Sequence, residues 1–181
     1  MLSPNGVKKA DWVSDTTAGD PRDFRIALGC FATGVTIVTT LGSDGRYVGL
    51  TVNSFSSVSM DPPLVLWSIA AKSPNLKAFQ ECSHFAINVL ADDQTDLCKV
   101  FSTPVADKFA GASITAGEEG VPLIDGAVAQ FECERFACYP GGDHEIVVGR
   151  VTRMRRSDRS PLLFCKGELR SLPAAPKLMV A

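Results

Sequence analysis

Short apolar runs rich in β-branched residues recur along the chain and are separated by turn-forming residues. The runs "VTIVTT" (35–40) and "YVGLTVNSF" (47–55) flank Asp44-Gly45, a dipeptide typical of two-residue hairpin turns. Two further runs, "PPLVLWSIA" (62–70) and "HFAINVL" (84–90), have the length and composition of buried strands. The first half of the chain is therefore predicted to be mainly β.

The longest strand patterns lie in the second half of the chain. The segment "AVAQFECERFACY" (127–139) alternates apolar with polar residues: Ala129, Phe131, Cys133 and Ala137 against Gln130, Glu132 and Glu134. This alternation predicts a strand with one face in the core and the other in water. The segment "HEIVVGRVTRMRR" (144–156) has the same pattern, and the glycine-rich "YPGGDH" between the two predicts a tight turn.

Three short helices are predicted between the strands. Asp20-Pro21 begins the first, which we expect to end at Gly34 with Phe24, Ala27, Leu28 and Phe31 on one face. In "SIAAKSPN" (68–75), Ser73 is a suitable N-cap and Pro74 suits the first turn of a second helix. Asp92 or Asp93 is expected to cap the third, which carries Leu97, Val100 and Phe101, and a glycine-rich passage (108–126) follows it.

The order of these elements predicts one mainly β domain with short helices. Strands outnumber helices and are joined mostly by hairpins, a pattern that fits an antiparallel barrel with helices at its ends. We expect residues 1–19 to be a mobile lead-in, residues 20–172 the domain, and residues 173–181 a tail. No G-x-G-x-x-G sequence follows a strand, so a Rossmann cofactor site has no support.

Composition and charge exclude several function classes. With 18 Lys and Arg against 20 Asp and Glu, the net charge is −2, and no electrostatic case exists for a nucleic-acid partner. No apolar run is long enough to span a bilayer, and the first residues lack the apolar stretch of a secretory signal, so a cytoplasmic protein without membrane contacts is expected. The six cysteines contain no C-x-x-C and predict buried reduced thiols; with only two histidines, no metal site is expected.

Three segments carry candidate chemistry. The first, "TVNSFSSVSMDPP" (51–63), gathers hydroxyl and amide side chains in one strand and turn, which is typical of a half-exposed strand but also suits the edge of a flat heterocycle. In the second, "SIAAKSPN", Lys72 stands beside a predicted helix start, where an anion would find a positive charge and free N–H groups. An ordinary capped helix with a surface lysine explains that segment equally well.

The third segment, "GGDHEIVVGRV" (141–151), places His144 at the start of a strand after two glycines. The imidazole either faces a substrate at the barrel rim or bonds to Asp143 within the turn. His84 leads directly into an apolar strand and is assigned a structural role. Because no arrangement suggests nucleophilic catalysis, the chemistry is expected to come from a bound cofactor.

Taken together, these segments resemble the short-chain flavin reductases, the small reductase partners of two-component flavin monooxygenases. The matching text, which spans about residues 20–172, is "FATGVTIVTT", "GLTVNSFSSVSMDPPLVLWSI", "KSPNLKAF", "HFAINVL", "DKFAG", "GDHEIVVGRV" and "PLLFCKG". The resemblance implies an FMN-binding split β-barrel, a homodimer of six-stranded Greek-key barrels with FMN near the dimer interface. It also implies NAD(P)H-dependent reduction of flavin and delivery of reduced flavin to a partner monooxygenase.

The resemblance also implies a set of site residues. The isoalloxazine edge would be lined by Thr51, Val52, Asn53 and Ser54, with Ser57 nearby. The ribityl chain and phosphate would be held by Ser68, Ile69, Ala70, Lys72 and Ser73. Phe101 would close over the flavin, and His144, the catalytic residue in this assignment, would face the nicotinamide.

Flavin and nucleotide preferences are only partly encoded. We see no arginine placed for a 2′-phosphate and expect NADH rather than NADPH, with FMN or FAD as the flavin. Two alternatives stay open: a flavoprotein that keeps FMN permanently for electron transfer or oxidase chemistry, and a non-enzymatic dimeric barrel that binds a partner protein.

Overall fold

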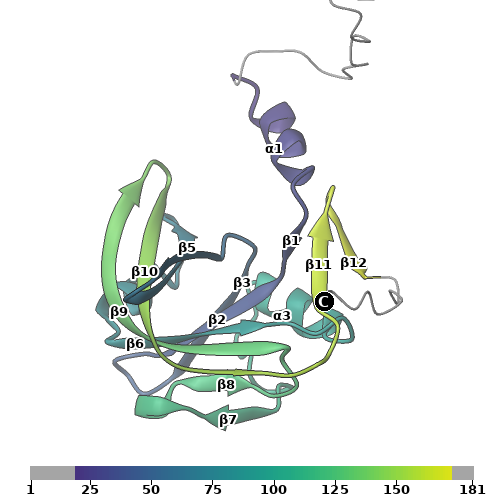
Figure 1. Ribbon diagram of the computed structural model, residues 1–181. Coiled ribbons are helices and arrows are strands. Elements are labelled where there is room, and N and C mark those ends of the chain that lie inside the picture. The colour runs from purple at the N-terminus through teal and green to yellow at the C-terminus, as the bar shows by residue number, and fades with distance from the viewer. Residues whose placement is uncertain (1–18, 173–181) are drawn as a thin grey trace, which may run out of the picture.

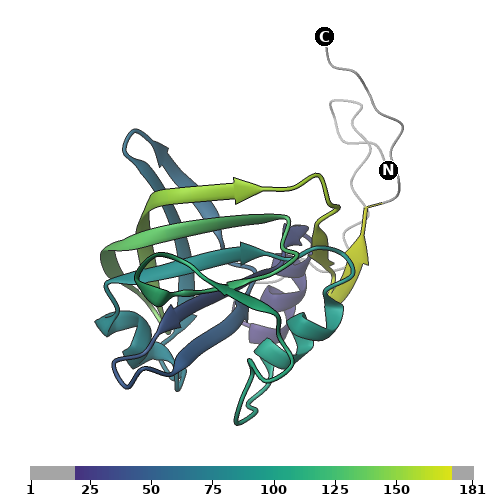
Figure 2. The ribbon, with the colours of Figure 1, turned by 90° about the horizontal axis from the view of Figure 1, so that it is seen from below.

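A computed structural model of the protein describes residues 19–172. Its main feature is a seven-stranded antiparallel sheet in the order β3-β2-β6-β9-β10-β5-β4, which curls around a common core (Figures 1 and 2). The strands are β2 Thr36–Leu41, β3 Tyr47–Val52, β4 Ser56–Met60, β5 Pro63–Ala70, β6 His84–Val89, β9 Ala129–Gly141 and β10 His144–Arg156. The mainly β fold and the predicted strand runs are thus confirmed, with seven strands in the curled sheet instead of six.

Smaller elements surround this sheet. Strand β1 Thr33–Gly34 pairs with β11 Leu162–Cys165, which pairs with β12 Glu168–Ser171; β7 Ile114–Ala116 and β8 Pro122–Ile124 form a separate hairpin around the 3₁₀ turn η1 Glu118–Gly120. The helices are α1 Pro21–Gly29, α2 Leu76–Glu81 and α3 Thr95–Ser102. None of the helices between residues 19 and 172 is both long and apolar enough to cross a membrane.

The described residues form three hydrophobic clusters in the interior, the smallest of which consists of Ala86, Val121 and Leu123. In the first, the ring of Trp67 on β5 packs edge-on against Phe79 of α2, with ring centroids 4.8 Å apart, and against Phe85 of β6. In the second, Phe101 of α3 packs with Val35 and Ile37 beneath β2. The two helices therefore cover different ends of the sheet, and the residues between β5 and α2 are held on a rigid base.

The prediction that the polar side chains of β9 face solvent is wrong for the first half of the strand. Gln130 and Glu132 are 6% and 4% exposed, because the β7–β8 hairpin and its turn cover them. Gln130 Nε2 donates to the Ile124 carbonyl at 2.7 Å and to Asn88 Oδ1 at 2.9 Å. Glu132 accepts from the Glu118 amide at 2.6 Å and from Arg155 at 3.4 Å. Polar alternation there marks a buried hydrogen-bond network.

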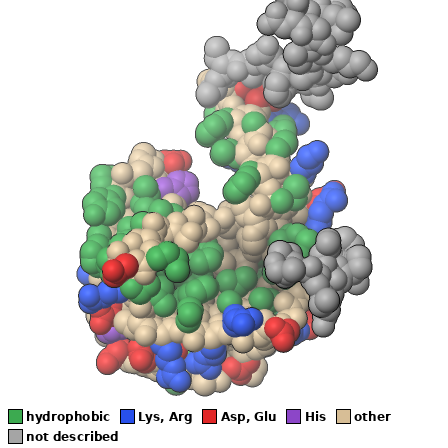
Figure 3. Space-filling view, viewed as in Figure 1, with side chains coloured by type: hydrophobic (Ala, Val, Ile, Leu, Met, Phe, Trp, Pro, Cys, Tyr) green, Lys and Arg blue, Asp and Glu red, His purple; other side chains and the backbone are tan. Residues whose placement is uncertain are grey.

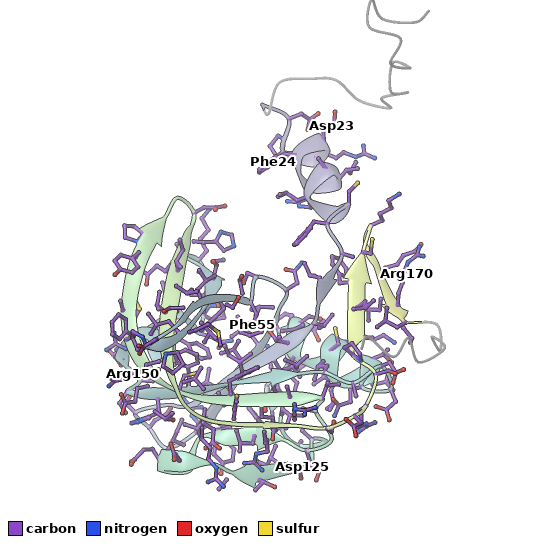
Figure 4. All side chains as sticks on the ribbon, viewed as in Figure 1. Asp23, Phe24, Phe55, Asp125, Arg150 and Arg170 are labelled. Atoms are coloured by element: carbon purple, nitrogen blue, oxygen red, sulfur yellow. The ribbon has the colours of Figure 1, made fainter. Side chains whose placement is uncertain are left out.

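The first helix begins as predicted, with Asp20 as its N-cap, but it ends at Gly29 instead of Gly34. None of its residues is buried, and the face that carries Phe24 does not pack on the barrel of the same chain. Figure 1 shows α1 projecting away from the sheet, and Figure 4 shows Phe24 on the projecting part. Cys30 at its end is likewise exposed, an exception to the expected burial of the thiols.

Two other local predictions need correction. Neither Asp92 nor Asp93 caps α3: its N-cap is Gln94, whose Oε1 accepts from the Ala91 amide at 3.0 Å, while Asp93 pairs with Arg159. The extents predicted for the lead-in and the tail fall almost entirely on residues 1–18 and 173–181, outside the described part.

Candidate active site

The corner between β3 and β4 is fastened to β5 by one serine. Ser54 Oγ accepts a hydrogen bond from the Ser68 amide at 2.9 Å and donates to the Ser68 carbonyl at 3.2 Å. These two bonds extend the antiparallel pairing of β4 with β5, in which Ser56 lies opposite Leu66, into the corner before β4. The structure therefore brings Ser54 and Ser68 together as predicted, but the Ser54 hydroxyl proton is already engaged.

The neighbouring residues of β3 differ in what they can offer a ligand. Thr51 Oγ1 donates to the Cys98 carbonyl of α3 at 2.9 Å, and the Val52 carbonyl accepts from Thr36 Oγ1 at 3.1 Å. Asn53 is exposed, and its side-chain amide makes no hydrogen bond within residues 19–172. Ser57 is exposed one strand further on. Asn53 thus has the unengaged side chain of this corner, whereas Thr51 keeps only acceptor capacity.

The turn between β5 and α2 replaces the predicted helix start. Helix α2 begins at Leu76, with Asn75 as its N-cap, so Ser73 is not a cap and Pro74 lies outside the helix. The Leu76 amide donates to the Ser73 carbonyl at 3.1 Å, and Ser73 Oγ accepts from the Asn75 amide at 3.3 Å. The Ser73 hydroxyl keeps its proton for another acceptor, and the exposed Lys72 beside it has no ion pair within the described residues.

His144 lies at the same end of β5. It pairs in register with Ala70, and the Ala71 amide donates to the Asp143 carbonyl at 2.9 Å, which ties the β9–β10 turn to the Lys72 turn. The Nδ1 atom of His144 lies 2.7 Å from Asp143 Oδ1, and 46% of the His144 side chain is exposed. The turn contact considered in the sequence is therefore present, and half of the imidazole still faces solvent.

The groups around this turn lower the pKa of Asp143. The hydrogen bond from His144 holds the pKa of Asp143 below its usual range, and the nearby charges of His144 and Lys72 act in the same direction. A carboxyl whose pKa is lowered stays ionised as the pH falls until that lower pKa is reached, so the Asp143 carboxylate is charged throughout the neutral range. Asp143 was not among the predicted site residues, although its place directly before His144 was the available signal.

Two of the predicted site residues have buried side chains. The Phe101 side chain is fully buried, packed edge-on against Phe109 with ring centroids 4.9 Å apart and lying against Gly49. Ile69 is 1% exposed and belongs to the Trp67 cluster. Neither side chain presents a surface to solvent in this structure, and the roles of Phe101 and Ile69 at the flavin stay predictions. Their apolar type fits core positions equally well, and sequence alone did not separate the two roles.

A comparison with known proteins identifies the family. Residues 28–173 match the family model described as "Flavin reductase like domain". This chain belongs to the flavin reductase-like family. It is 50% identical over 146 residues to the FMN reductase (NADH) SmoA of Agrobacterium fabrum, an alignment that covers 81% of this chain and 83% of that protein.

Other flavin reductases support the same conclusion. The reductase component of the trigonelline monooxygenase of Acinetobacter baylyi is 44% identical over 146 residues, which cover 81% of this chain but only 47% of that protein. The solved NADH:FAD oxidoreductase SgcE6 of Streptomyces globisporus, in complex with NAD and FAD fragments, is 38% identical with a TM-score of 0.81, covering 90% of this chain and 99% of that one. The expected activity, NAD(P)H-dependent reduction of a flavin, and the barrel fold are confirmed.

The residues at this end of the flavin reductase barrel suit a flavin phosphate. Lys72 has no competing ion pair in the described residues, and the Ser73 hydroxyl has a proton to donate to an anionic oxygen. Asn53 supplies an amide that can donate to or accept from the polar edge of the ring. In the described part of the chain, no group of three or more His, Cys, Asp or Glu side chains is placed to hold a metal ion.

Proposed function

We propose that this flavin reductase uses NADH to reduce FMN and releases the reduced flavin to a separate monooxygenase. The supporting observation is the gathering of Asn53, Lys72 and His144, each with an exposed side chain, at one end of a barrel of the flavin reductase family. An open site of this kind favours a flavin that enters and leaves over one that is held permanently. The chain spans 83% of SmoA but about half of the trigonelline reductase component. Delivery of reduced flavin to a monooxygenase is therefore a part of this proposal.

Each proposed role follows from the hydrogen-bonding groups and charges that remain available at the site. Lys72 and Ser73 hold the phosphate, and Asn53 with the backbone of residues 51–54 binds the ring edge. Ser57 extends this edge along β4, and Ser68 and Ala70, near the end of β5, lie beside the ribityl chain. A bound flavin supplies the hydride acceptor. The chain's own contribution is to align two rings and to place hydrogen-bond donors where negative charge grows.

His144 is assigned to the nicotinamide. Asp143 fixes one ring nitrogen, so the opposite nitrogen is directed away from the turn and is available to orient a carboxamide. We assign it no proton transfer, because hydride moves between two atoms that do not belong to the protein. Its role is to position the nicotinamide ring.

The activity test is direct. The purified protein mixed with FMN and NADH without oxygen should bleach the flavin absorbance over many turnovers, and NADPH should do so less efficiently. Absence of bleaching with either nucleotide would refute the proposal. Dialysis before the assay separates the alternatives: a protein that keeps its yellow colour is a permanent flavoprotein, and one whose melting temperature does not rise with FMN does not bind FMN in its native state.

We also infer that the protein is a homodimer, because α1 exposes apolar side chains that no element within residues 19–172 covers. Phe24, Ile26, Leu28 and Phe31 are 52%, 58%, 58% and 77% exposed. Figure 3 shows hydrophobic side chains along α1 and on the face of the barrel beside it. Residues four apart share a helix face, so Phe24 and Leu28 lie together on α1, whereas Ile26 lies on the opposite side and Phe31 follows the helix end. Exposed apolar side chains gathered in this way are typical of an interaction site, and a second copy offers the matching apolar surface around β4, where Val58 and Met60 are exposed.

Light scattering coupled to size-exclusion chromatography tests the dimer. The wild-type protein should elute with twice the 19.3 kDa mass of one chain. Leu28→Asp should shift the mass towards one chain, because a buried charge at the interface is costly. As a control, Lys77→Asp, which changes an exposed side chain of α2, should leave the mass unchanged; a monomeric wild type would contradict the inference.

A further inference from the structure

A second hollow lies away from the candidate flavin site. It has a volume of about 330 Å³ and lies between α2 and the β9–β10 hairpin, lined by Gln80, Arg135, Cys138, Tyr139, Pro140 and Glu145. None of the residues assigned to flavin or nicotinamide lines it. Successive side chains of a strand point to opposite faces, so Glu145 faces this hollow while its neighbour His144 faces the other side of β10.

Arg135 is held rigidly at the wall of this hollow. Its Nε donates to the Cys82 carbonyl at 2.8 Å, and its backbone amide donates to the Ser83 carbonyl at 2.8 Å. Within residues 19–172 it forms no ion pair with a carboxylate. Glu145, the carboxylate that shares the hollow, accepts instead from Gln80 Nε2 at 2.6 Å. The two terminal nitrogens of the guanidinium are therefore positioned and unpaired.

The chemistry of the walls selects a class of ligand. The end of a fixed guanidinium matches the two oxygens of a carboxylate, which can bind in a bidentate manner. The nearby negative charge of Glu145 disfavours a doubly charged phosphate. Cys138 and Pro140 provide an apolar wall, and the volume is near the lower limit for ligand pockets, about 300 Å³, so the body of the ligand is about one ring in size.

We propose that this hollow is a binding site for a small monocarboxylate with an apolar body, such as an aromatic acid, anchored by Arg135. It is separate from the flavin site and does not depend on the function proposed for that site. A carboxylate bound there lies against α2, the helix that follows the Lys72 turn.

Benzoate is a suitable probe, with benzamide as an uncharged analogue of the same shape and inorganic phosphate as a second anion. In ligand-observed NMR titrations of the full chain, benzoate should bind saturably with a Kd of about 1–10 mM, and benzamide at least about fivefold more weakly. Arg135→Gln should weaken benzoate binding about tenfold. Arg153→Gln is the control: it removes an exposed arginine of β10 that does not line the hollow, and it should leave benzoate binding unchanged. Equal binding by the Arg135 variant, or phosphate binding as tight as benzoate, would overturn the proposal.

A protection experiment on the unaltered protein tests the same site without depending on a variant that folds. Cys138 lines the hollow, so saturating benzoate should slow its alkylation by iodoacetamide severalfold, read from the modified peptide by mass spectrometry. Cys30 on the projecting segment serves as the internal control and should react at an unchanged rate. Unchanged alkylation of Cys138, or displacement of FMN by benzoate, would show that the carboxylate does not bind in this hollow.

Discussion

The proposed phosphate contact can be tested by comparing two flavins that differ only in the phosphate. Lys72→Gln removes the ammonium, and Ser73→Ala removes the hydroxyl proton that is not used within the turn. Both variants should bind FMN more weakly, while riboflavin, which has no phosphate, should bind to them as it does to the wild type. Since Ser73 is not a helix cap, Ser73→Ala removes only the 3.3 Å hydrogen bond from the Asn75 amide and should cost about 1 kcal/mol of stability or less.

The exposure of the turn sets the expected magnitude. Lys72 is exposed, so its attraction to a phosphate about 4 Å away is close to the value in water, about 1 kcal/mol. The nearby Asp143 carboxylate reduces this attraction further. A hydroxyl hydrogen bond to an anion contributes about 1 kcal/mol in a partly exposed position. Each substitution should therefore raise the Kd for FMN about fivefold.

Quenching of flavin fluorescence measures both dissociation constants. The effect of Lys72→Gln should shrink at high salt, because exposed charges are screened, whereas the effect of Ser73→Ala should not. Lys77→Gln is a matched control, since Lys77 is an exposed lysine whose nearest carboxylate is Glu81 at 3.7 Å. If the Lys72 and Ser73 variants weaken FMN and riboflavin equally, the phosphate does not bind at this turn.

Three further changes test other parts of the structure. His144→Ala should raise the KM for NADH severalfold and leave the Kd for FMN within about twofold, since the ring is assigned to the nicotinamide; the opposite pattern in steady-state and binding assays would refute that role. Gly149→Ala should lower the melting temperature and cost about 1–3 kcal/mol, because an added Cβ would overlap the ring of Phe85, whereas Gly111→Ala, in open space, should cost little. Asn88→Leu should cost about 3 kcal/mol in denaturant unfolding, because it leaves several buried hydrogen-bonding groups unpaired. A loss below about 1 kcal/mol would show that this network contributes little.

Local sequence patterns predicted the strands well. The hairpin at Asp44-Gly45 forms, with Gly45 at a φ of 77°, and the second glycine of "YPGGDH", Gly142, has a φ of 73° between the two long strands. Both positions need a left-handed backbone that glycine adopts without strain. The candidate segments also meet as expected, because the register of β5 with β10 places Ala70 opposite His144.

Predictions that depended on distant contacts were less successful. Gln130 and Glu132 follow the pattern of an exposed strand face, yet they are buried because a hairpin from residues 114–124 covers them. Phe101 suited a ligand cover as well as a core position, and its side chain packs against Phe109 in the core of this structure.

The sequence by itself determined where strands and turns occur, because β-branched runs and positive-φ glycines act over a few residues. It also determined the family, through motifs ordered along most of the chain. Tertiary structure alone decided which polar side chains remain free to bind a ligand. The hydroxyl protons of Thr51 and Ser54 are engaged by carbonyl groups 47 and 14 residues away in the chain, whereas the side chain of Asn53 between them has no hydrogen-bond partner among residues 19–172. Hydrogen-bond partners so far apart are brought together only by the closed fold, and no local pattern encodes them.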